Sequence, residues 1–439
     1  MGLIQQIIEF FSFQDVNIRY VTLGTVLLGA SSALVGCFTF LRKKALVGDT
    51  IAHSILPGIC LSFIIFETKD PLMLLLGAMI SGWLSIYIVD YISANSKIKP
   101  DTAIGLILSV FFGIGVLLLT YIQHSGNAAQ AGLDKFLFGK AASLVQNDVI
   151  IFGIVSMFLI GIVILFFKQF SLISFDIHFA KTIGIPVKIF EIVLSTITVL
   201  AVAIGIQTVG VVLMAAMLIT PASAARFWTH KLKVMIIIAA IIGAVSGLFG
   251  AFISYTSPSM PTGPWIVVVL SFIAIGSMLL SPKNGAISKI RKQSKNQQKI
   301  LEDNILKLLY KLGEKENDFF INRSISALKS YREIPANKFL KGLNILKKKN
   351  YVLLVNDLWV LTEEGKKAGM RIVKIHRLWE LYLTTYLRIA PDHVHEDAET
   401  IEHIITPEME LKLEQVLNFP EKDPHNVNIP YKNEKHNND

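Results

Sequence analysis

The sequence has little charge and almost no cysteine. Charged residues make up 17% of its 439 residues, hydrophobic residues make up 52%, and the mean hydropathy is +0.54. These values lie outside the usual range of soluble proteins and predict a protein with many membrane spans. The two cysteines, Cys37 and Cys60, lie within apolar stretches, which argues against a disulfide framework and favours hydrophobic packing roles.

Two targeting and binding signals are also missing. The N-terminus lacks a basic segment followed by a short apolar core and a cleavage site, so we expect the first span to remain in the mature protein. The net charge of +9 is divided between the apolar part and the hydrophilic part, so charge alone does not indicate nucleic-acid binding.

About 20 apolar residues cross a bilayer as a helix. The sequence predicts nine such spans, near 20–41, 46–66, 71–93, 102–122, 148–167, 188–206, 208–226, 234–254 and 264–281. The stretch 188–226 leaves open whether its glycines break one helix or join two.

Lysine and arginine concentrate in alternate loops, around 42–44, 97–99, 168–188 and 226–233. Positively charged residues favour the cytoplasmic side of a membrane. We therefore expect the N-terminus outside and the C-terminal segment in the cytoplasm.

Asp49 and His53 stand out because ionisable residues within membrane spans are rare and costly. Residues four apart share a helix face, where a carboxylate oxygen and an imidazole nitrogen can bind one divalent cation such as manganese, iron or zinc. The alternative is that Asp49 caps a helix beginning at Thr50 while His53 hydrogen-bonds a neighbouring helix.

Three ordered stretches resemble the manganese, zinc and iron ABC-transporter permease family: 41–58, 175–186 and 209–225. The resemblance covers about residues 15–282. It implies that Asp49 and His53 line and gate the ion path, and that Asp176, Ala180 and Gly184 belong to the cytoplasmic segment that meets the ATPase. His178 in that segment is expected to be a surface side chain rather than a ligand.

The same resemblance implies partners at a bacterial plasma membrane: a cytoplasmic ATPase subunit, an extracytoplasmic metal-binding protein, and a second permease chain, either identical or a paralogue. The chain itself lacks a phosphate-binding loop, since Gly139-Lys140 is followed by Ala141 and position 134 is Asp. We therefore expect a permease that is not an enzyme.

A hydrophilic segment follows Pro282. Residues 283–299 form a basic connector suited to anionic lipid. Beyond it, apolar periodicity predicts helices over 301–312 and 336–349 and a hairpin that pairs 351–354 with 358–361, which together indicate a winged helix. A long helix is expected after Thr362 and through His376.

Potential metal ligands gather in this tail. His376 and Glu380 are four residues apart, and a second group shares one helical face: His395, Glu399, Glu402 and His403. The alternative is a solvated polar face opposite the apolar residues Val394 and Ile401.

The tail resembles the diphtheria-toxin-repressor and manganese-transport-regulator family over about residues 300–432, through the stretches 376–380, 394–403 and 423–430. The resemblance implies one metal site from Glu399, Glu402 and His403, and an adjacent one from His376, Glu380 and His395. Glu399 stands where iron-responsive members carry cysteine, and an oxygen donor favours manganese or ferrous iron.

DNA contact is a further possibility for the tail. Lys338, Lys341 and Lys347 could contact phosphates, although an exposed lysine face is also common in solvated domains.

We therefore predict an all-α polytopic membrane protein with a cytoplasmic winged-helix and helical metal-binding, dimerising tail. The predicted domains are residues 1–282, a linker 283–299, and tail domains 300–365 and 366–439. The expected function is an importer permease for manganese, with iron or zinc as alternatives, whose tail senses metal and regulates transport. The rival is a permease fused to a metal-dependent repressor that acts at the membrane or after release; export is disfavoured only by the resemblance.

Overall fold

The computed structural model describes residues 3–42, 44–68, 70–124, 139, 144–257, 260–329, 331, 335–390, 394, 399, 401–403 and 405–431. The chain divides into two compact units, Met1–Lys289 and Ile290–Asp439. We call them the membrane unit and the tail.

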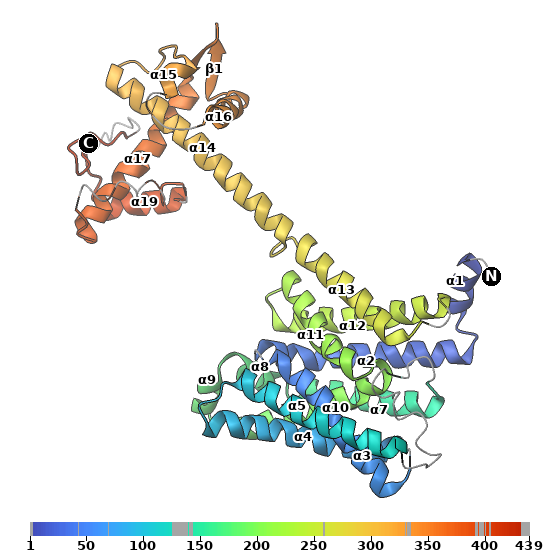
Figure 1. Cartoon of the computed structure of the whole chain (residues 1–439). Coiled ribbons are helices and arrows are strands. Elements are labelled where there is room, and N and C mark those ends of the chain that lie inside the picture. The colour runs from blue at the N-terminus through green and yellow to red at the C-terminus, as the bar shows by residue number, and fades with distance from the viewer. Residues whose placement is uncertain are drawn as a thin grey trace. The chain divides into compact units, whose positions relative to one another are not determined.

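Helices make up the described part of the membrane unit (Figure 1): α1 (Leu3–Ser12), α2 (Val16–Leu41), α3 (Ala45–Phe66), α4 (Pro71–Asn95), α5 (Pro100–His124), α7 (Gln146–Leu165), α8 (Phe167–Phe175), α9 (Ile177–Thr182), α10 (Val187–Val209), α11 (Val211–Trp228), α12 (Leu232–Thr256) and α13 (Thr262–Leu280). Among the described residues, eight helices are long and apolar enough to span a membrane, namely α2, α3, α4, α5, α7, α10, α12 and α13.

The remaining predicted span, 208–226, corresponds to α11, whose apolar part, Leu213–Trp228, is shorter. Gly210 separates it from α10 with a φ of 91°, in the left-handed region that favours glycine. The stretch 188–226 is therefore two helices joined at one residue.

Small residues let the helices of the membrane unit approach closely. α2 packs along α12, and α3 packs against both α4 and α5. Where α3 meets α4, a Cβ added at Gly58 would lie 2.1 Å from the carbonyl oxygen of Gly77. Close backbone contact of this kind supplies the van der Waals packing that holds helices together in lipid.

The tail contains α14 (Ala286–Glu316, which begins in the membrane unit), α15 (Ile325–Lys329), α16 (Ala336–Lys348), strands β1 (Val352–Val355) and β2 (Leu358–Leu361), α17 (Glu363–Tyr386) and α19 (Pro407–Val416). The strands form an antiparallel hairpin in which Val352 faces Leu361. Asn356 and Asp357 make its turn with φ values of 47° and 61°, a conformation that these residue types tolerate.

This order confirms the predicted winged helix. The connector 283–299 differs from a plain linker because it is helical from Ala286 onward and continuous with α14. Lysine, arginine and glutamine are good helix formers, and no glycine or proline interrupts them between 286 and 312.

Two apolar clusters hold the tail together. Ile305 and Leu309 of α14 pack with Phe339 and Leu343 of α16 and with Trp359 of β2. A second cluster joins Leu378 of α17, Leu413 of α19 and Ile429. Thr362 caps α17 by accepting a hydrogen bond from the Gly365 amide, which fixes where this helix starts.

Candidate metal sites in the membrane unit and the tail

Asp49 and His53 lie side by side on α3. The distance between Asp49 Oδ1 and His53 Nε2 is 3.5 Å, and their side chains are 38% and 17% exposed. The imidazole meets the ring of Phe112 on α5 edge to face, at a centroid distance of 4.9 Å. Its Nδ1 is buried and has no hydrogen-bond partner among the described residues.

The two simpler roles considered for this pair do not fit. Asp49 is not an N-cap, because α3 begins at Ala45 and Asp49 lies within the helix. His53 makes a ring contact with α5, but its free Nδ1 lacks the interhelical hydrogen bond that the alternative requires. His53 Nε2 and Asp49 Oδ1, which lie 3.5 Å apart on one face of α3, can instead serve as ligands for a divalent cation.

The segment expected to meet an ATPase is the short helix α9. Asp176 caps it by accepting a hydrogen bond from the Phe179 amide at 2.9 Å. Ala180 is fully buried, and Gly184 ends the segment with a φ of 83°. Phe179 and Ile183 are 52% and 53% exposed, so the helix presents an apolar surface, and His178 is also exposed.

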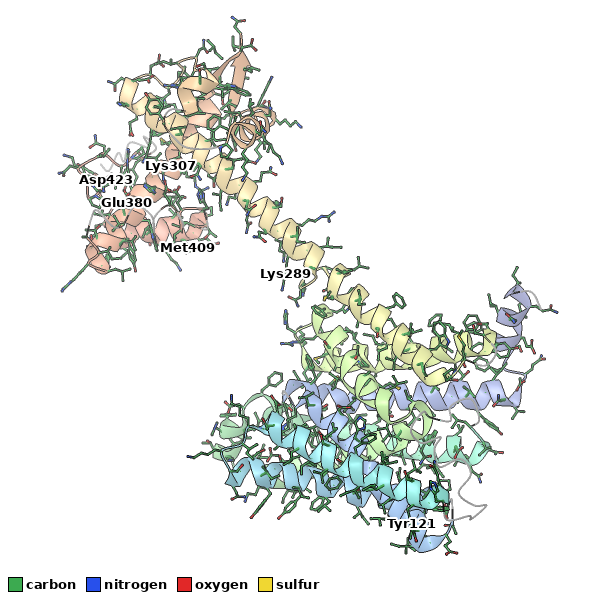
Figure 2. The ribbon with its side chains drawn as sticks, in the orientation of Figure 1. Tyr121, Lys289, Lys307, Glu380, Met409 and Asp423 are labelled. Carbon is green, nitrogen blue, oxygen red and sulfur yellow. The ribbon has the colours of Figure 1, made fainter. Side chains whose placement is uncertain are left out.

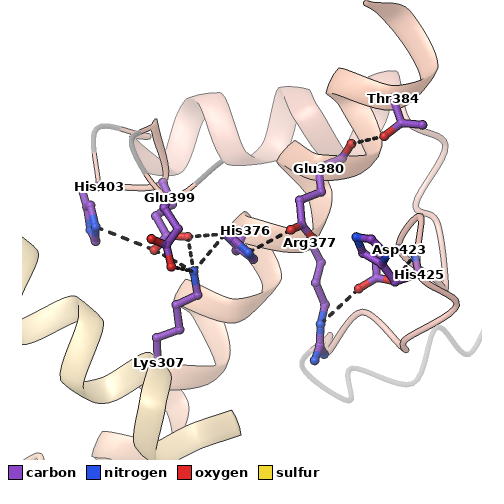
Figure 3. Close-up of polar contacts among 10 residues, drawn as sticks. Lys307, His376, Arg377, Glu380, Thr384, Glu399, His403, Asp423 and His425 are labelled. Atoms are coloured by element: carbon purple, nitrogen blue, oxygen red, sulfur yellow. Dashed lines mark hydrogen bonds and ion pairs between the residues drawn. The ribbon is translucent and has the colours of Figure 1, made fainter. Parts of the chain in front are cut away.

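In the tail, polar side chains from three segments gather around one ammonium group, that of Lys307 on α14 (Figures 2 and 3). Lys307 Nζ donates to Glu402 Oε2 at 2.9 Å and to Oε1 at 3.1 Å, and lies 3.0 Å from His376 Nδ1. Glu399 Oε1 is 3.7 Å away. The side chain of Lys307 is only 3% exposed, and that of Glu402 is fully buried.

Further contacts extend this cluster on both sides. His376 Nδ1 lies 2.5 Å from Glu402 Oε2, and its Nε2 lies 3.1 Å from Glu380 Oε1 on the same helix. On the other side, His403 Nδ1 lies 3.0 Å from Asp303 Oδ2 of α14, and His403 Nε2 lies 3.7 Å from Glu402 Oε1. We call Lys307, His376, Glu380, Glu399, Glu402, His403 and Asp303 the tail cluster.

The electrostatics of the cluster centre on Lys307 and Glu402. Burial disfavours the charged ammonium and lowers the pKa of Lys307, although Glu402 partly offsets this effect. Burial also disfavours the Glu402 carboxylate, but its contacts with His376 and Lys307 outweigh burial and lower the pKa of Glu402. The environment therefore favours the Glu402 carboxylate, whereas the Lys307 ammonium is less favoured than it would be in water.

The structure joins two groups of residues that the sequence analysis assigned to separate sites, since His376 touches Glu402. His395 lies outside the described residues. Among the residues that are described, no three His, Cys, Asp or Glu side chains are arranged to hold a metal ion. Nitrogen and oxygen donors of these kinds are the ligands that divalent transition metals prefer.

Sequence reasoning missed the role of Lys307. The sequence does show that Lys299, Asp303 and Lys307 are spaced four residues apart on α14, so they share one face of the helix. Lys299 Nζ donates to the carbonyl oxygen of His403 at 3.1 Å, Asp303 contacts the His403 side chain, and Lys307 contacts Glu402. All three residues therefore contact the segment that carries Glu402.

The lysines considered for DNA contact lie on α16. Lys338, Lys341 and Lys347 are all exposed, whereas Phe339 and Leu343 of the same helix are buried.

Comparisons with known proteins agree with this two-part organisation. The model of the ABC 3 transport family matches residues 14–281. The model of the iron dependent repressor, metal binding and dimerisation domain, matches residues 362–431.

Individual relatives point the same way. The manganese transport system membrane protein MntC of Bacillus subtilis is 41% identical over 382 residues, which cover 87% of each chain. The zinc transport system membrane protein TroC of Treponema pallidum is 42% identical over 278 residues, which cover 63% of this chain and 93% of the relative.

A solved structure, PsaBC from Streptococcus pneumoniae in complex with Fab, matches with a TM-score of 0.58 at 34% identity, over 63% of this chain and 97% of that chain. The chain therefore belongs to the ABC 3 transport family as a multi-pass metal-transport permease, and its tail carries the metal-binding and dimerisation domain of iron-dependent repressors.

Proposed function

We propose that the membrane unit is the permease subunit of an importer that carries manganese across the membrane, and that the tail regulates this transport. The observation that carries the proposal is the pair Asp49 and His53, with a buried, unpartnered imidazole nitrogen within a membrane helix. Relatives named for manganese and for zinc transport support a divalent transition metal as cargo.

The pair suits a cargo ion that must be held and then released. Asp49 offers a hard oxygen and His53 a borderline nitrogen, which together bind manganese, ferrous iron or zinc. Two ligands leave most of the coordination shell to water or to other groups, so the site binds the ion transiently. The contact between His53 and Phe112 couples the ligand to α5, so that a shift of α5 would reorient the imidazole.

Energy for transport comes, in this proposal, from a separate ATPase subunit that docks on α9. The cap at Asp176, the buried Ala180 and the turn at Gly184 hold the helix rigidly, while the exposed side chains of Phe179 and Ile183 form the docking surface. An extracytoplasmic metal-binding protein would deliver the ion, and a second permease chain would complete the pathway. The N-terminus lies outside and the tail in the cytoplasm.

We assign residues 1–282 to the permease, 283–299 to a connector that contacts anionic lipid, 300–365 to the winged helix and 366–439 to metal sensing and dimerisation. The residues that would hold the regulatory metal are His376, Glu380, His395, Glu399, Glu402 and His403. Metal in the tail would report sufficiency inside the cell, and the tail would then favour a permease conformation that transports less.

The test of the permease assignment is uptake of radiolabelled manganese by cells that express the partner subunits. We expect His53→Ala and Asp49→Asn each to lower manganese uptake by about tenfold or more, since each changes one of the two ligands. The matched control is His124→Ala, because His124 is exposed at the end of α5. Full uptake by both ligand variants would refute the assignment.

A second candidate function rests on the exposed lysines of α16. Together with the hairpin β1–β2 they form a surface able to contact phosphates, so the tail could act as a metal-dependent repressor at the membrane or after cleavage near 283–299. Detection in cells of a free fragment of about residues 300–439 that binds DNA would favour this function over transport control.

A further inference from the structure

The most unusual group of the tail is the buried lysine at the centre of the tail cluster. Figure 3 shows Glu399 and His376 beside the Lys307 ammonium. Glu402 Oε2 lies 2.9 Å from the same ammonium. Buried lysines are rare and normally need a specific partner. Here the partners are donors of the kind that bind divalent metals, and the lysine fills the space between them.

A structural ion pair with Glu402 would not need this arrangement. An ion pair needs only carboxylate partners, yet Lys307 also approaches an imidazole nitrogen at 3.0 Å, in addition to Glu402 and a second carboxylate at 3.7 Å. Lys374 shows the simpler pattern: it lies 2.6 Å from both Glu410 and Glu414, and among the described residues it has no ion pair with a histidine. A ligand set of two carboxylates and one imidazole is instead typical of a site for manganese or iron.

The Lys307 ammonium and a divalent ion would compete for these donors. A divalent ion held by Glu402 and His376 would lie within a few ångströms of the Lys307 ammonium, and in a buried environment the repulsion between them is strong. The cluster also has a route to solvent, because Glu402 borders a pocket of about 1050 Å³ that is lined by Lys299, Asp303 and Arg371 among others. Lys307 does not itself line this pocket, so its side chain would have to rotate past Glu402 to bring the ammonium there.

We propose that Lys307 is a built-in competitor for the regulatory metal, whose ammonium occupies the donors His376, Glu399 and Glu402 and must be displaced before they bind a divalent ion. This inference rests on the proposed sensing role of the tail. Competition by the Lys307 ammonium raises the metal concentration that is needed to occupy the tail cluster. A permease under feedback needs such a high threshold, because it should slow only when the cell already holds enough metal.

The first test measures manganese binding to the purified full chain in lipid nanodiscs, with His53→Ala in every sample so that the cargo ligands do not contribute. We expect Lys307→Met to bind manganese about tenfold more tightly or better, since the competing charge is gone. Lys307→Arg keeps the charge and Lys315→Met removes an exposed lysine of the same helix, so both should bind as the parent does.

Binding by Lys307→Met that is no tighter than that of its parent would overturn the proposal, as would equal gains in all three variants. If neither Lys307→Met nor its parent binds manganese in the tail, the proposal is also refuted. A further change of Glu402→Gln in the Lys307→Met chain should abolish the gain, which assigns it to the tail cluster.

A second measurement needs no change at Lys307. In the chain with only His53→Ala, an amine-reactive reagent followed by mass spectrometry reports how accessible Lys307 is. We expect Lys307 to be protected in the presence of chelator and to react when the tail is filled with manganese, whereas Lys315 should react in both states. Continued protection of Lys307 with manganese bound would show that the two cations do not compete.

These outcomes separate the inference from the proposed function. If Lys307→Met binds manganese more tightly but uptake is the same in metal-loaded and metal-starved cells, competition is upheld and regulation of transport by the tail is refuted. If uptake declines in metal-loaded cells but Lys307→Met binds manganese no more tightly than its parent, regulation is upheld and competition is refuted.

Discussion

At the residue scale, Gly36 marks a close approach of two membrane helices. A Cβ at this position of α2 would lie 1.7 Å from the carbonyl oxygen of Leu218 in α11. No side-chain rotation relieves a clash with backbone, so the helices would have to separate.

We expect Gly36→Ala to destabilise the membrane unit by about 1–3 kcal/mol, the usual range for overpacking. The measurement is the thermal unfolding midpoint of the purified full chain in detergent. Gly161→Ala on α7 is the control, because no atom lies within 4 Å of its added Cβ. Equal midpoints for Gly36→Ala and Gly161→Ala would contradict the packing described for α2 and α11.

Also at this scale, residue identity indicates candidate ligands but not the environment in which the fold places them. Asp49 and His53 were recognisable because charge is rare in apolar spans and their spacing puts them on one helix face. Lys307 was not recognisable, because a lysine on an amphipathic helix is normally solvated. Only the fold brings the segment around Glu402 against α14 and buries the ammonium there.

At the element scale, α9 is so short that its stability depends on the N-cap residue Asp176. It spans six residues, from Ile177 to Thr182, and isolated helices of this length are unstable. The hydrogen bond from the Phe179 amide to Asp176 therefore contributes a large part of its local stability.

We expect Asp176→Ala to destabilise α9 by about 1 kcal/mol and so to weaken the coupling between ATP hydrolysis and transport. Asp176→Asn should behave like the parent, because asparagine caps helices as well as aspartate does. The measurement is manganese transported per ATP hydrolysed by the reconstituted transporter. Equal coupling in Asp176→Ala and Asp176→Asn would mean that the cap is not what positions α9.

Secondary structure was predictable where local chemistry determines it. The hairpin around Asn356-Asp357 and the start of α17 at Thr362 follow from turn and cap residues, and both are confirmed. The connector after Pro282 was less clear from the sequence, since a charged segment without an apolar face is equally suited to a helix or a flexible chain. Its helical continuation into α14 is what carries Asp303 and Lys307.

At the scale of the whole molecule, a metal permease and a repressor-type metal-binding domain share one chain. Each unit has its own apolar core. A single chain fixes the ratio of permease to metal-binding domain at one to one. This arrangement favours control of transport over control of distant genes.

We propose that the tail lowers manganese uptake when the cell already contains enough manganese. The most direct measurement compares radiolabelled manganese uptake by metal-starved and metal-loaded cells for three chains: intact, stopped after Pro282, and Glu402→Ala. We predict that all three take up manganese when starved and that only the intact chain slows when loaded. An equal decline in all three chains would contradict the claim.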